Sequence, residues 1–577
     1  MFELRLTPAN VSAQAAQKLP RWALWAVLIL FMLPALLSRD IWTVREAAAF
    51  GEMMEMSQGN FLSWLLPTSS EVYVVDHGPL ATWLGALFIK LFGDWISPIV
   101  ASRLTATIWF AIATAGIWYG TWYLARRREA QPVAQVFGVA ASYRDYGRLI
   151  SDAATLFFVS ICGLAVRHHE ATYETAELAL VAMAYFGCTW SMSRPYWGAM
   201  IAGLASGAVM LAASLLSGVT VLLAACLSQL VVHVRGRTDT KITIAVGTAL
   251  ITFSLWPFSA LLLAGDNATD YFLLWAQAQA NAFGIFNQSE IIWFLQHVLW
   301  YLCPVLPFAI AGVWLWRHQL DTPMLSMPLA FVAAWAIGFL ISDSLSAEDL
   351  FAIIIPALCT LAAFGLIAVR RSWRSMLDCF AITSFCLILF LLWAYWIAWQ
   401  TGTPVKMYES AVRLAPSLSP SSVVQWPVGG AVLATLVWIY FSYQRLRAHP
   451  KVLWTGPWLG AVGMTCLWCV VIGLFSTAVD ANRSYRSVAQ DLRKELGAMN
   501  FVFGMDCVYI GSMPSGVSAV LGYYGQLDVT RAEPTVCRYE ITRTTAKALG
   551  PAPLPRAFKR ESQTQERFVV LKRSPLM

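Results

Sequence analysis

The sequence predicts an all-α polytopic membrane protein of about 13 transmembrane helices with a small C-terminal α/β extracytoplasmic domain. Three observations predict this class. The 577-residue chain is 58% hydrophobic and only 13% charged, whereas soluble proteins average roughly 25% charged residues. Its mean hydropathy is +0.59, and apolar runs long enough to cross a bilayer recur along it. Soluble enzymes, disordered or fibrous chains and soluble nucleic-acid-binding proteins are therefore excluded.

The apolar runs set the order of the predicted spans, because a membrane-crossing helix needs about 20 apolar residues. The first run follows Lys18 and lacks a small-residue cleavage site, which predicts a retained span over 21–37. The apolar segment 79–92 is short, so we expect it to lie in the membrane interface within the first outer loop, 38–98. Twelve further spans are predicted at 101–125, 150–167, 171–190, 197–214, 215–233, 241–264, 297–316, 326–343, 350–369, 376–400, 426–443 and 453–478.

Basic residues give the orientation. The net charge of +7 says little about partners, because Lys and Arg first of all mark the cytoplasmic ends of spans. Residues 1–20 are predicted to be cytoplasmic, 21–478 to form the transmembrane domain and 479–577 to lie outside as a periplasmic domain. The basic clusters of the short loops all fall on the cytoplasmic side of this topology: Arg126 to Arg128, Arg194, Arg235 with Arg237, Arg317, Arg370 with Arg371, and Arg445 to Lys451.

The C-terminal tail predicts a small α/β domain. A helical pattern covers 485–496, and strand-like runs occupy 501–504, 508–510 and 568–571. Cys507 and Cys537 lie in this polar region, where an extracytoplasmic location permits a disulfide. Spacing alone leaves that pairing open. Most other cysteines lie inside apolar runs and are interpreted as small hydrophobic residues.

Polar residues of the first outer loop are the first functional candidates, because ionisable groups at a membrane boundary are costly. Arg45 and Glu46, with Glu52 at helical spacing, place an acidic stripe beside a guanidinium on a short helix. A solvated helix face explains the same pattern. Asp76 and His77 follow before a Gly-Pro turn, and this pair suits a metal ion or, through the imidazole, proton transfer.

A second group follows the third predicted span. Arg167, His168, His169, Glu170 and Glu174 lie at the outer ends of two consecutive spans, where a helix break would let the acids point into a shared cavity. An ordinary polar turn is the alternative.

A third group lies between 277 and 301. Its amides, with aromatic residues such as Tyr301, suit a sugar or lipid headgroup. They suit an ordinary outer loop equally well.

The order of these features resembles the GT-C membrane glycosyltransferases, specifically the lipid A aminoarabinose transferases and protein O-mannosyltransferases. The resemblance covers most of the chain. It rests on Trp42-Thr43-Val44-Arg45-Glu46, Glu52-Met53, Gly59-Asn60-Phe61, Gly78 to Ala86, Ala101-Ser102-Arg103-Leu104, His168 to Glu174, Arg194 to Gly198, Trp300 to Pro304, and Ile354-Ile355-Pro356.

The resemblance implies transfer of a sugar from a polyprenyl-phosphate donor to a lipid or glycan acceptor on the outer face. In that family an Asp-Glu pair on the first loop helix and a second acid on the next outer turn face the substrates. Glu46 matches the Glu of the pair, and Glu174 falls where the second acid is expected. An inverting transfer needs a carboxylate to take the acceptor proton and cations to offset the phosphate's charge.

The sequence departs from the family pattern where charge complementarity matters. Arg45 stands where the first Asp is expected, and Asp76-His77-Gly78 replaces a Glu-Lys-Pro. Ala213 replaces part of a Ser-Lys-Gly, and Ala347 and Asp349 replace basic residues. Arg45, His77, Arg167 and His168 remain as nearby cations, of which Arg45 has the fork geometry that binds phosphate.

Two interpretations follow. The chain is a divergent polyprenyl-phosphate sugar transferase of the bacterial inner membrane, with Glu46 or Glu174 as base and Arg45 at the donor phosphate, or a non-catalytic relative that binds a lipid or a partner membrane protein. A divalent metal ion is left open, and no nucleic acid is expected. A transporter is disfavoured because the sequence shows no pair of broken spans.

Overall fold

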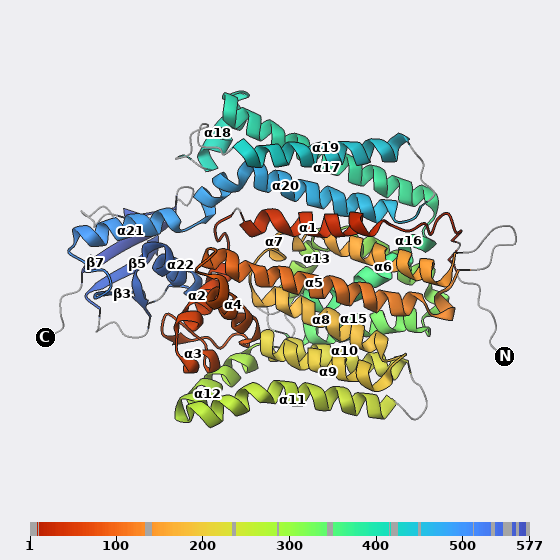
Figure 1. The fold of residues 1–577 in the computed structure, drawn as a ribbon, viewed down its shortest axis with the longest axis horizontal. Coiled ribbons are helices and arrows are strands. Elements are labelled where there is room, and N and C mark those ends of the chain that lie inside the picture. The colour runs from red at the N-terminus through yellow and green to blue at the C-terminus, as the bar shows by residue number, and fades with distance from the viewer. Residues whose placement is uncertain are drawn as a thin grey trace.

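The computed structural model describes residues 8–9, 11–37, 39–132, 141–232, 238–284, 288–342, 350–414, 416, 425–447, 452–511, 513–531, 537–545, 557–560 and 565–572. Long helices run side by side along the longest axis of the molecule, and a small sheet lies at one end of them (Figure 1). We call this the sheet end. The first helix of the chain, α1 (Arg21–Leu37), starts at the opposite end, which we call the N-terminal end.

A helix occupies every stretch predicted to cross the membrane. Among the described residues, seven helices are long and apolar enough to span a bilayer, or eight when one bent pair counts as a span. The chain is therefore a multi-pass membrane protein, and the count of 13 spans stays a prediction. The long helices are α1 Arg21–Leu37, α5 Pro98–Ala125, α6 Tyr143–Ser160, α8 Tyr173–Trp190, α9 Pro195–Ala212, α10 Leu215–Val231, α11 Thr238–Ala264, α15 Pro323–Leu340, α16 Phe351–Ala368, α17 Arg371–Thr401, α19 Gln425–Arg447 and α20 Thr455–Arg483.

Two stretches predicted as single spans are broken, so the expectation that the sequence lacks broken spans was wrong. The stretch 150–167 divides into α6 and the short α7 Leu164–Arg167. The stretch 297–316 divides into α13 Gln288–Tyr301 and α14 Val305–Leu315, which meet at a bend of 96°. Pro304 lies in the second break, where it cannot donate a backbone hydrogen bond.

The two breaks satisfy each other's backbone groups, which explains why they form inside the bundle. The N–H of Cys162 donates to the carbonyl oxygen of Cys303 at 3.1 Å, and the N–H of Gly163 donates to that of Tyr301 at 2.9 Å. Gly163 lies flat against the ring of Tyr301, since a Cβ added there would come within 2.2 Å of the ring. Hydrogen-bond pairing between distant breaks leaves no periodic signal in the sequence.

Short elements cover the sheet end of the bundle. Both helices predicted between residues 38 and 98 are present, and the interfacial location of the second stays a prediction. These elements are α2 Val44–Gln58, α3 Phe61–Leu65, the hairpin β1 Thr68–Ser69 with β2 Val72–Tyr73, α4 Leu80–Phe92, α12 Asp266–Asn281 and α18 Val405–Leu414; two 3-10 turns, η1 Arg128–Ala130 and η2 Arg317–Gln319, lie elsewhere.

The C-terminal region forms an α/β unit, as predicted. Its sheet has the order β4-β3-β5-β7-β6, in which β3 runs parallel to both neighbours and the other pairs are antiparallel. The predicted strand at 501–504 was wrong, because this segment is a turn in which Val502 N donates to Asp506 Oδ2 at 2.8 Å. The elements are α21 Arg486–Ala498, β3 Cys507–Tyr509, α22 Ser515–Gly525, β4 Asp528–Thr530, β5 Tyr539–Thr545, β6 Ala557–Phe558 and β7 Glu566–Lys572.

The C-terminal unit packs on the first outer loop. A disulfide joins Cys507 to Cys537 with a Cα–Cα distance of 5.1 Å. Helix α22 lies directly on α2, because a Cβ on Gly516 would meet the carbonyl oxygen of Val44 at 2.2 Å. Buried apolar residues of both parts, such as Phe50 and Leu521, share one core. The tail therefore fixes the position of α2.

The N-terminal end gathers the basic loops that the described residues contain. Lys18 pairs with Asp145 at 3.2 Å, and Arg21 pairs with Asp152 at 2.8 Å, so the start of the chain lies against α6. The guanidinium of Arg126 lies over the ring of Tyr143 at 5.0 Å. Arg235, Arg237 and Lys451 lie outside the described residues.

Candidate functional site

Glu46 lies buried at the start of α2 between two arginines. Thr43 caps this helix by accepting from Glu46 N at 3.1 Å, which fixes where the helix begins. Arg39 donates to its two oxygens at 2.8 and 3.1 Å, and Arg103 Nε donates at 2.7 Å. Burial raises the pKa of Glu46, but the two guanidiniums outweigh it and hold the pKa below its usual range.

The arginines of this network also bind backbone oxygens of neighbouring segments. Arg39 donates to the carbonyl oxygen of His169 at 2.7 Å, and Arg103 donates to those of Arg39 and Asp40 at 2.6 and 2.9 Å. No role was predicted from the sequence for Arg39 or Arg103. The available signal was that Arg103 is a lone charge within an apolar helix.

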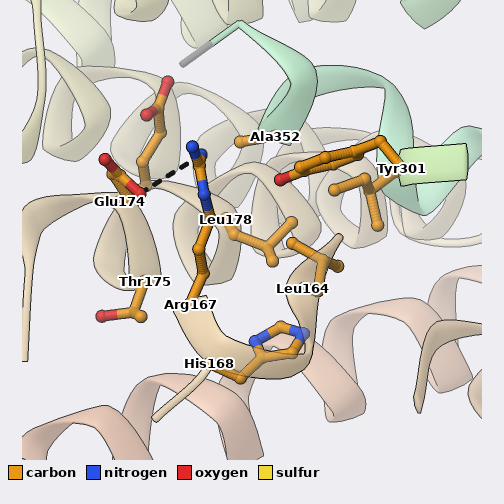
Figure 2. A pocket seen from close by; sticks show the side chains of 10 residues that line it. Leu164, Arg167, His168, Glu174, Thr175, Leu178, Tyr301 and Ala352 are labelled. Carbon is orange, nitrogen blue, oxygen red and sulfur yellow. Dashed lines mark ion pairs between the residues drawn. The ribbon is translucent and has the colours of Figure 1, made fainter. Parts of the chain in front are cut away.

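Glu174 lies in the first turn of α8 and pairs with two further arginines. Arg45 from α2 donates to its Oε1, and Arg167 Nη1 lies 3.3 Å from its Oε2. Figure 2 shows Arg167 reaching from α7 toward Glu174, with the ring of Tyr301 beside it. The Glu174 side chain is 9% exposed, whereas that of Arg45 is 47% exposed. Solvent and ligands thus reach the pair from the Arg45 side.

A small cavity adjoins this ion pair. Its volume is about 20 Å³, close to that of one water molecule. Arg167, Glu174 and Tyr301 line it, together with Leu164, His168, Thr175, Glu177, Leu178, Ala352 and Ile355. Tyr301 also stacks on Phe351 at 5.0 Å. The predicted residues Glu174, Arg167, His168 and Tyr301 therefore meet in one place, and sequence reasoning missed Glu177.

His168 does not supply the cation that the sequence predicted. Its ring lies among Phe31, Phe110 and Phe158, with centroid distances of 4.8 to 6.1 Å. Burial, with a smaller effect of His169, lowers the pKa of His168 to about 3. The imidazole is therefore neutral at pH 7 and does not act as a phosphate-binding cation. Another group has to supply that positive charge. The sequence did not show that three distant phenylalanines meet around this turn.

His169 is buried beside it and serves the packing of the turn. Its Nδ1 lies 2.6 Å from the carbonyl oxygen of Ala165, and its Nε2 lies 2.7 Å from that of Phe31. The ring stacks on Trp468 at 4.7 Å. These contacts join the turn to α1 and α20 and leave His169 no open face toward the cavity.

Glu170 lies buried between the two ion-pair networks. Burial is the main cause that raises its pKa to about 8, and the nearby carboxylates Glu46 and Glu174 add to it. Its Oε1 has no hydrogen-bond partner among the described residues. A neutral carboxyl group is the form that this position favours at pH 7.

The Glu170→Gln variant tests whether the carboxyl group of Glu170 is protonated in the folded protein. A glutamate with pKa about 8 when folded and near 4.3 when unfolded makes the native state less stable as the pH rises between those values. Melting temperatures of both proteins, measured from pH 5 to 8.5, should diverge, with the variant more stable than the parent at pH 8.5 by on the order of 3 kcal/mol. An exposed-site control, Glu71→Gln, should follow the parent protein. Parallel curves for the Glu170→Gln protein and the parent would contradict the raised pKa.

His77 pairs with Glu52, whereas the sequence suggested Asp76 and His77 as two possible ligands of one metal ion. Its Nε2 lies 3.4 Å from Glu52 Oε2, which also accepts from the hydroxyl of Thr82 at 3.3 Å. Burial lowers the pKa of His77, but Glu52 outweighs burial and the pKa rises to about 9. The ring lies 4.7 Å from that of Tyr173, so an imidazolium stands beside the start of α8. The side chain of Asp76 is exposed.

The Gly-Pro turn holds this histidine against the bundle. The N–H of Gly78 donates to the carbonyl oxygen of Ala213 at 3.0 Å, and a Cβ on Gly78 would come within 2.1 Å of Leu211 O. Gln279 donates to the carbonyl oxygens of Val75 and Asp76 at 3.2 and 3.1 Å. Ala213 and Gln279 therefore position the loop. Ala347 and Asp349 lie outside the described residues.

The pH dependence of stability tests the His77 charge. A histidine whose folded pKa is about 9 stabilises the native state fully below its unfolded value near 6.5 and loses that contribution as the pH rises through 9. The parent should exceed His77→Gln in stability by on the order of 2 kcal/mol at pH 6.5, and the gap should close by pH 10. Glu52→Gln should remove the same pH-dependent part. A gap that stays constant with pH would show that His77 contributes through packing alone.

Among the described residues, no three His, Cys, Asp or Glu side chains form a group that would hold a metal ion. Cationic side chains lie around Glu174 and the start of α8 instead. Arg45 and Arg167 flank Glu174, and the imidazolium of His77 stands at the positive N-terminal end of α8. Such a surrounding favours an anion of higher charge than a carboxylate, such as a phosphate.

Comparisons with known proteins identify the architecture. No family of known sequences and no curated relative matches the chain. The crystal structure of ArnT from Cupriavidus metallidurans bound to undecaprenyl phosphate matches with a TM-score of 0.65 at 14% identity, over 95% of this chain and 97% of that one. The apo state of ArnT matches over the same shares at 0.64 and 14% identity. AglB, an archaeal oligosaccharyltransferase from Archaeoglobus fulgidus, has a TM-score of 0.40 at 10% identity over 92% of this chain and 70% of that one. The chain therefore has the fold of ArnT, the GT-C fold.

Proposed function

We propose that the protein is a membrane glycosyltransferase that moves a sugar from a polyprenyl-phosphate carrier to a lipid or glycan acceptor. The observation that carries the proposal is the pairing of Glu174 with Arg45 and Arg167 beside the start of α8. The ArnT fold supports it, since that protein binds undecaprenyl phosphate. Sugar transfer needs a carboxylate and phosphate-binding cations within one site.

Glu174 is the carboxylate that we assign as the base. It lines the cavity and pairs with a half-exposed arginine. Glu46 is 2% exposed and both of its oxygens are held by the guanidiniums of Arg39 and Arg103, so we assign it a structural role rather than a catalytic one.

The proposed step follows from the charges. A donor phosphate draws Arg45 and Arg167 away from Glu174 because it offers them more negative charge. The freed carboxylate takes the proton of the acceptor hydroxyl while the acceptor oxygen bonds to the anomeric carbon. The bond from that carbon to the phosphate oxygen breaks, and its electron pair leaves with the polyprenyl phosphate. The two guanidiniums and the His77 imidazolium offset the added charge on the phosphate.

We place this site on the periplasmic face of a bacterial inner membrane. The basic loops gather at the N-terminal end of the bundle, which the positive-inside rule assigns to the cytoplasm. The first outer loop, 38–98, and the C-terminal domain, 479–577, then lie in the periplasm. A disulfide between Cys507 and Cys537 agrees with an oxidising compartment.

A second candidate function is a non-catalytic one, in which the fold binds a lipid or a partner membrane protein. The cavity favours it, because a volume of about 20 Å³ does not hold a pyranose. Under the first function, donor binding enlarges this cavity by separating Arg167, which lines it, from Glu174.

One experiment separates the two functions. The full-length protein in nanodiscs is given undecaprenyl-phosphate-linked sugars and a lipid extract, and released undecaprenyl phosphate is measured over time. Catalytic release supports the transferase. Binding of undecaprenyl phosphate at one per protein without turnover supports the lipid-binding form of the second function, and absence of both release and binding contradicts the transferase and that form.

A further inference from the structure

A basic cavity lies at the N-terminal end of the bundle, far from Glu174. Its volume is about 250 Å³, and the starts of α17 and α20 and the end of α19 form it. Arg371, Arg374 and Arg445 line it together with one acid, Asp378. Three guanidiniums thus meet a single carboxylate at a membrane boundary, where uncompensated charge is costly.

The carboxylate of Asp378 is already paired with one of the three arginines. Arg445 donates to Asp378 Oδ2 through Nη2 at 2.6 Å and through Nε at 3.0 Å. Arg374 Nε is buried and has no hydrogen-bond partner among the described residues. Arg371 and Arg374 therefore leave the cavity with an excess of positive charge, which an anion would neutralise.

An apolar groove continues from the cavity along the membrane-spanning surface. It has a volume of about 590 Å³ and runs between α1, α19 and α20. Arg445 and Thr455 line both the cavity and the groove, so the two are joined. Apolar side chains such as Trp22, Phe441 and Val462 form its walls.

The length of the groove matches one leaflet of a bilayer. Along α20 its lining runs from Thr455 to Cys466, which is roughly 16 Å at a rise of 1.5 Å per residue. The hydrocarbon core of a bilayer is about 30 Å thick. The groove therefore begins at the polar boundary beside the arginines and ends near the midplane, as one lipid chain does.

We propose that the cavity and groove together bind one anionic phospholipid. Its phosphate lies against Arg371 and Arg374, with the remaining donors of Arg445 beside it, and one acyl chain fills the groove. Basic pockets between membrane-spanning helices bind lipid headgroups in this way. The assignment stands apart from the Glu174 site, because it uses other helices and the opposite end of the bundle.

The test measures lipid binding to the full-length protein in neutral detergent by native mass spectrometry and by melting temperature. Phosphatidylglycerol should bind at one per protein and raise the melting temperature saturably. Arg371→Gln with Arg374→Gln should weaken its apparent Kd about tenfold. The control Arg447→Gln, an exposed arginine beside Tyr443 on the same helix end, should bind as the parent does.

Two further arms identify the occupant. Ala26→Trp fills the groove and leaves all three arginines in the sequence, so it should weaken phosphatidylglycerol binding even if the double variant folds poorly. Glycerol phosphate, which has no chain, should bind far more weakly than phosphatidylglycerol. Equal binding of phosphatidylcholine, equally tight binding of glycerol phosphate, or unchanged affinity in both the double variant and the groove variant would overturn the proposal.

Discussion

The Glu174→Gln variant is expected to lose sugar transfer by about a thousandfold, within the range for removing a general base. The amide keeps the shape of the side chain and accepts a hydrogen bond, but it cannot take the acceptor proton. Its contact with Arg167 survives in weaker form, so donor binding should persist. The measurement is the initial rate of undecaprenyl phosphate release at saturating donor, together with the apparent KM for the donor.

Variants of the flanking arginines should separate binding from chemistry. Arg45→Gln removes a guanidinium from the proposed phosphate position, so it should raise the KM for the donor about tenfold or more. Asp94→Asn is the control for Glu174→Gln, because it neutralises an exposed acid of the first outer loop. It should retain the parent rate. A Glu174→Gln protein that transfers sugar at the parent rate would rule out Glu174 as the base.

The positions of the helices could be predicted because hydrophobic runs of fixed length obey one simple constraint. Each predicted span contains a helix, and Arg45 does meet Glu174, although 129 residues separate them. Topology placed both positions on the same face of the membrane, which this pairing requires, but the pairing itself was not predicted.

The other features of the fold and the site depend on contacts that no local sequence pattern predicts. The breaks at Gly163 and Pro304 exist because each supplies hydrogen-bond partners to the other. His168 is neutral because three phenylalanines from α1, α5 and α6 surround it. The helix α22 and the strand β5 were missed, since short elements that owe their stability to packing have weak periodicity.

The roles of two neighbouring residues on α2 could not be separated by sequence either. Arg45 and Glu46 are adjacent, yet one is half-exposed beside the cavity and the other is buried. Adjacent helical positions point about 100° apart, so the face that is buried decides which residue serves structure. That choice follows from the packing of α2 against α22 and α5, and this leads to a second large effect.

The Glu46→Gln variant is expected to lose about 3–5 kcal/mol of stability. The side chains of Arg39 and Arg103 are at most 1% exposed, so losing the carboxylate leaves two buried guanidiniums without a counter-charge. The measurement is the fraction of monodisperse protein that remains after heating, by size-exclusion chromatography. Glu55→Gln is the control on the same helix, because its carboxylate accepts from the neutral donors Thr68 and Ser70; its loss should be about 1 kcal/mol.

A triple variant tests whether charge or packing accounts for the stability lost in Glu46→Gln. Replacing Arg39, Glu46 and Arg103 together by Met, Leu and Met removes every charge of the network, which often restores stability in buried ion networks. The recovery here should be partial, because the carbonyl oxygens of Asp40 and His169 lose their donors. The Glu46→Gln protein that remains folded should transfer sugar at a rate near the parent's, whereas Glu174→Gln should be stable and inactive. If folded Glu46→Gln protein were as inactive as Glu174→Gln, the base would have to be reassigned to Glu46.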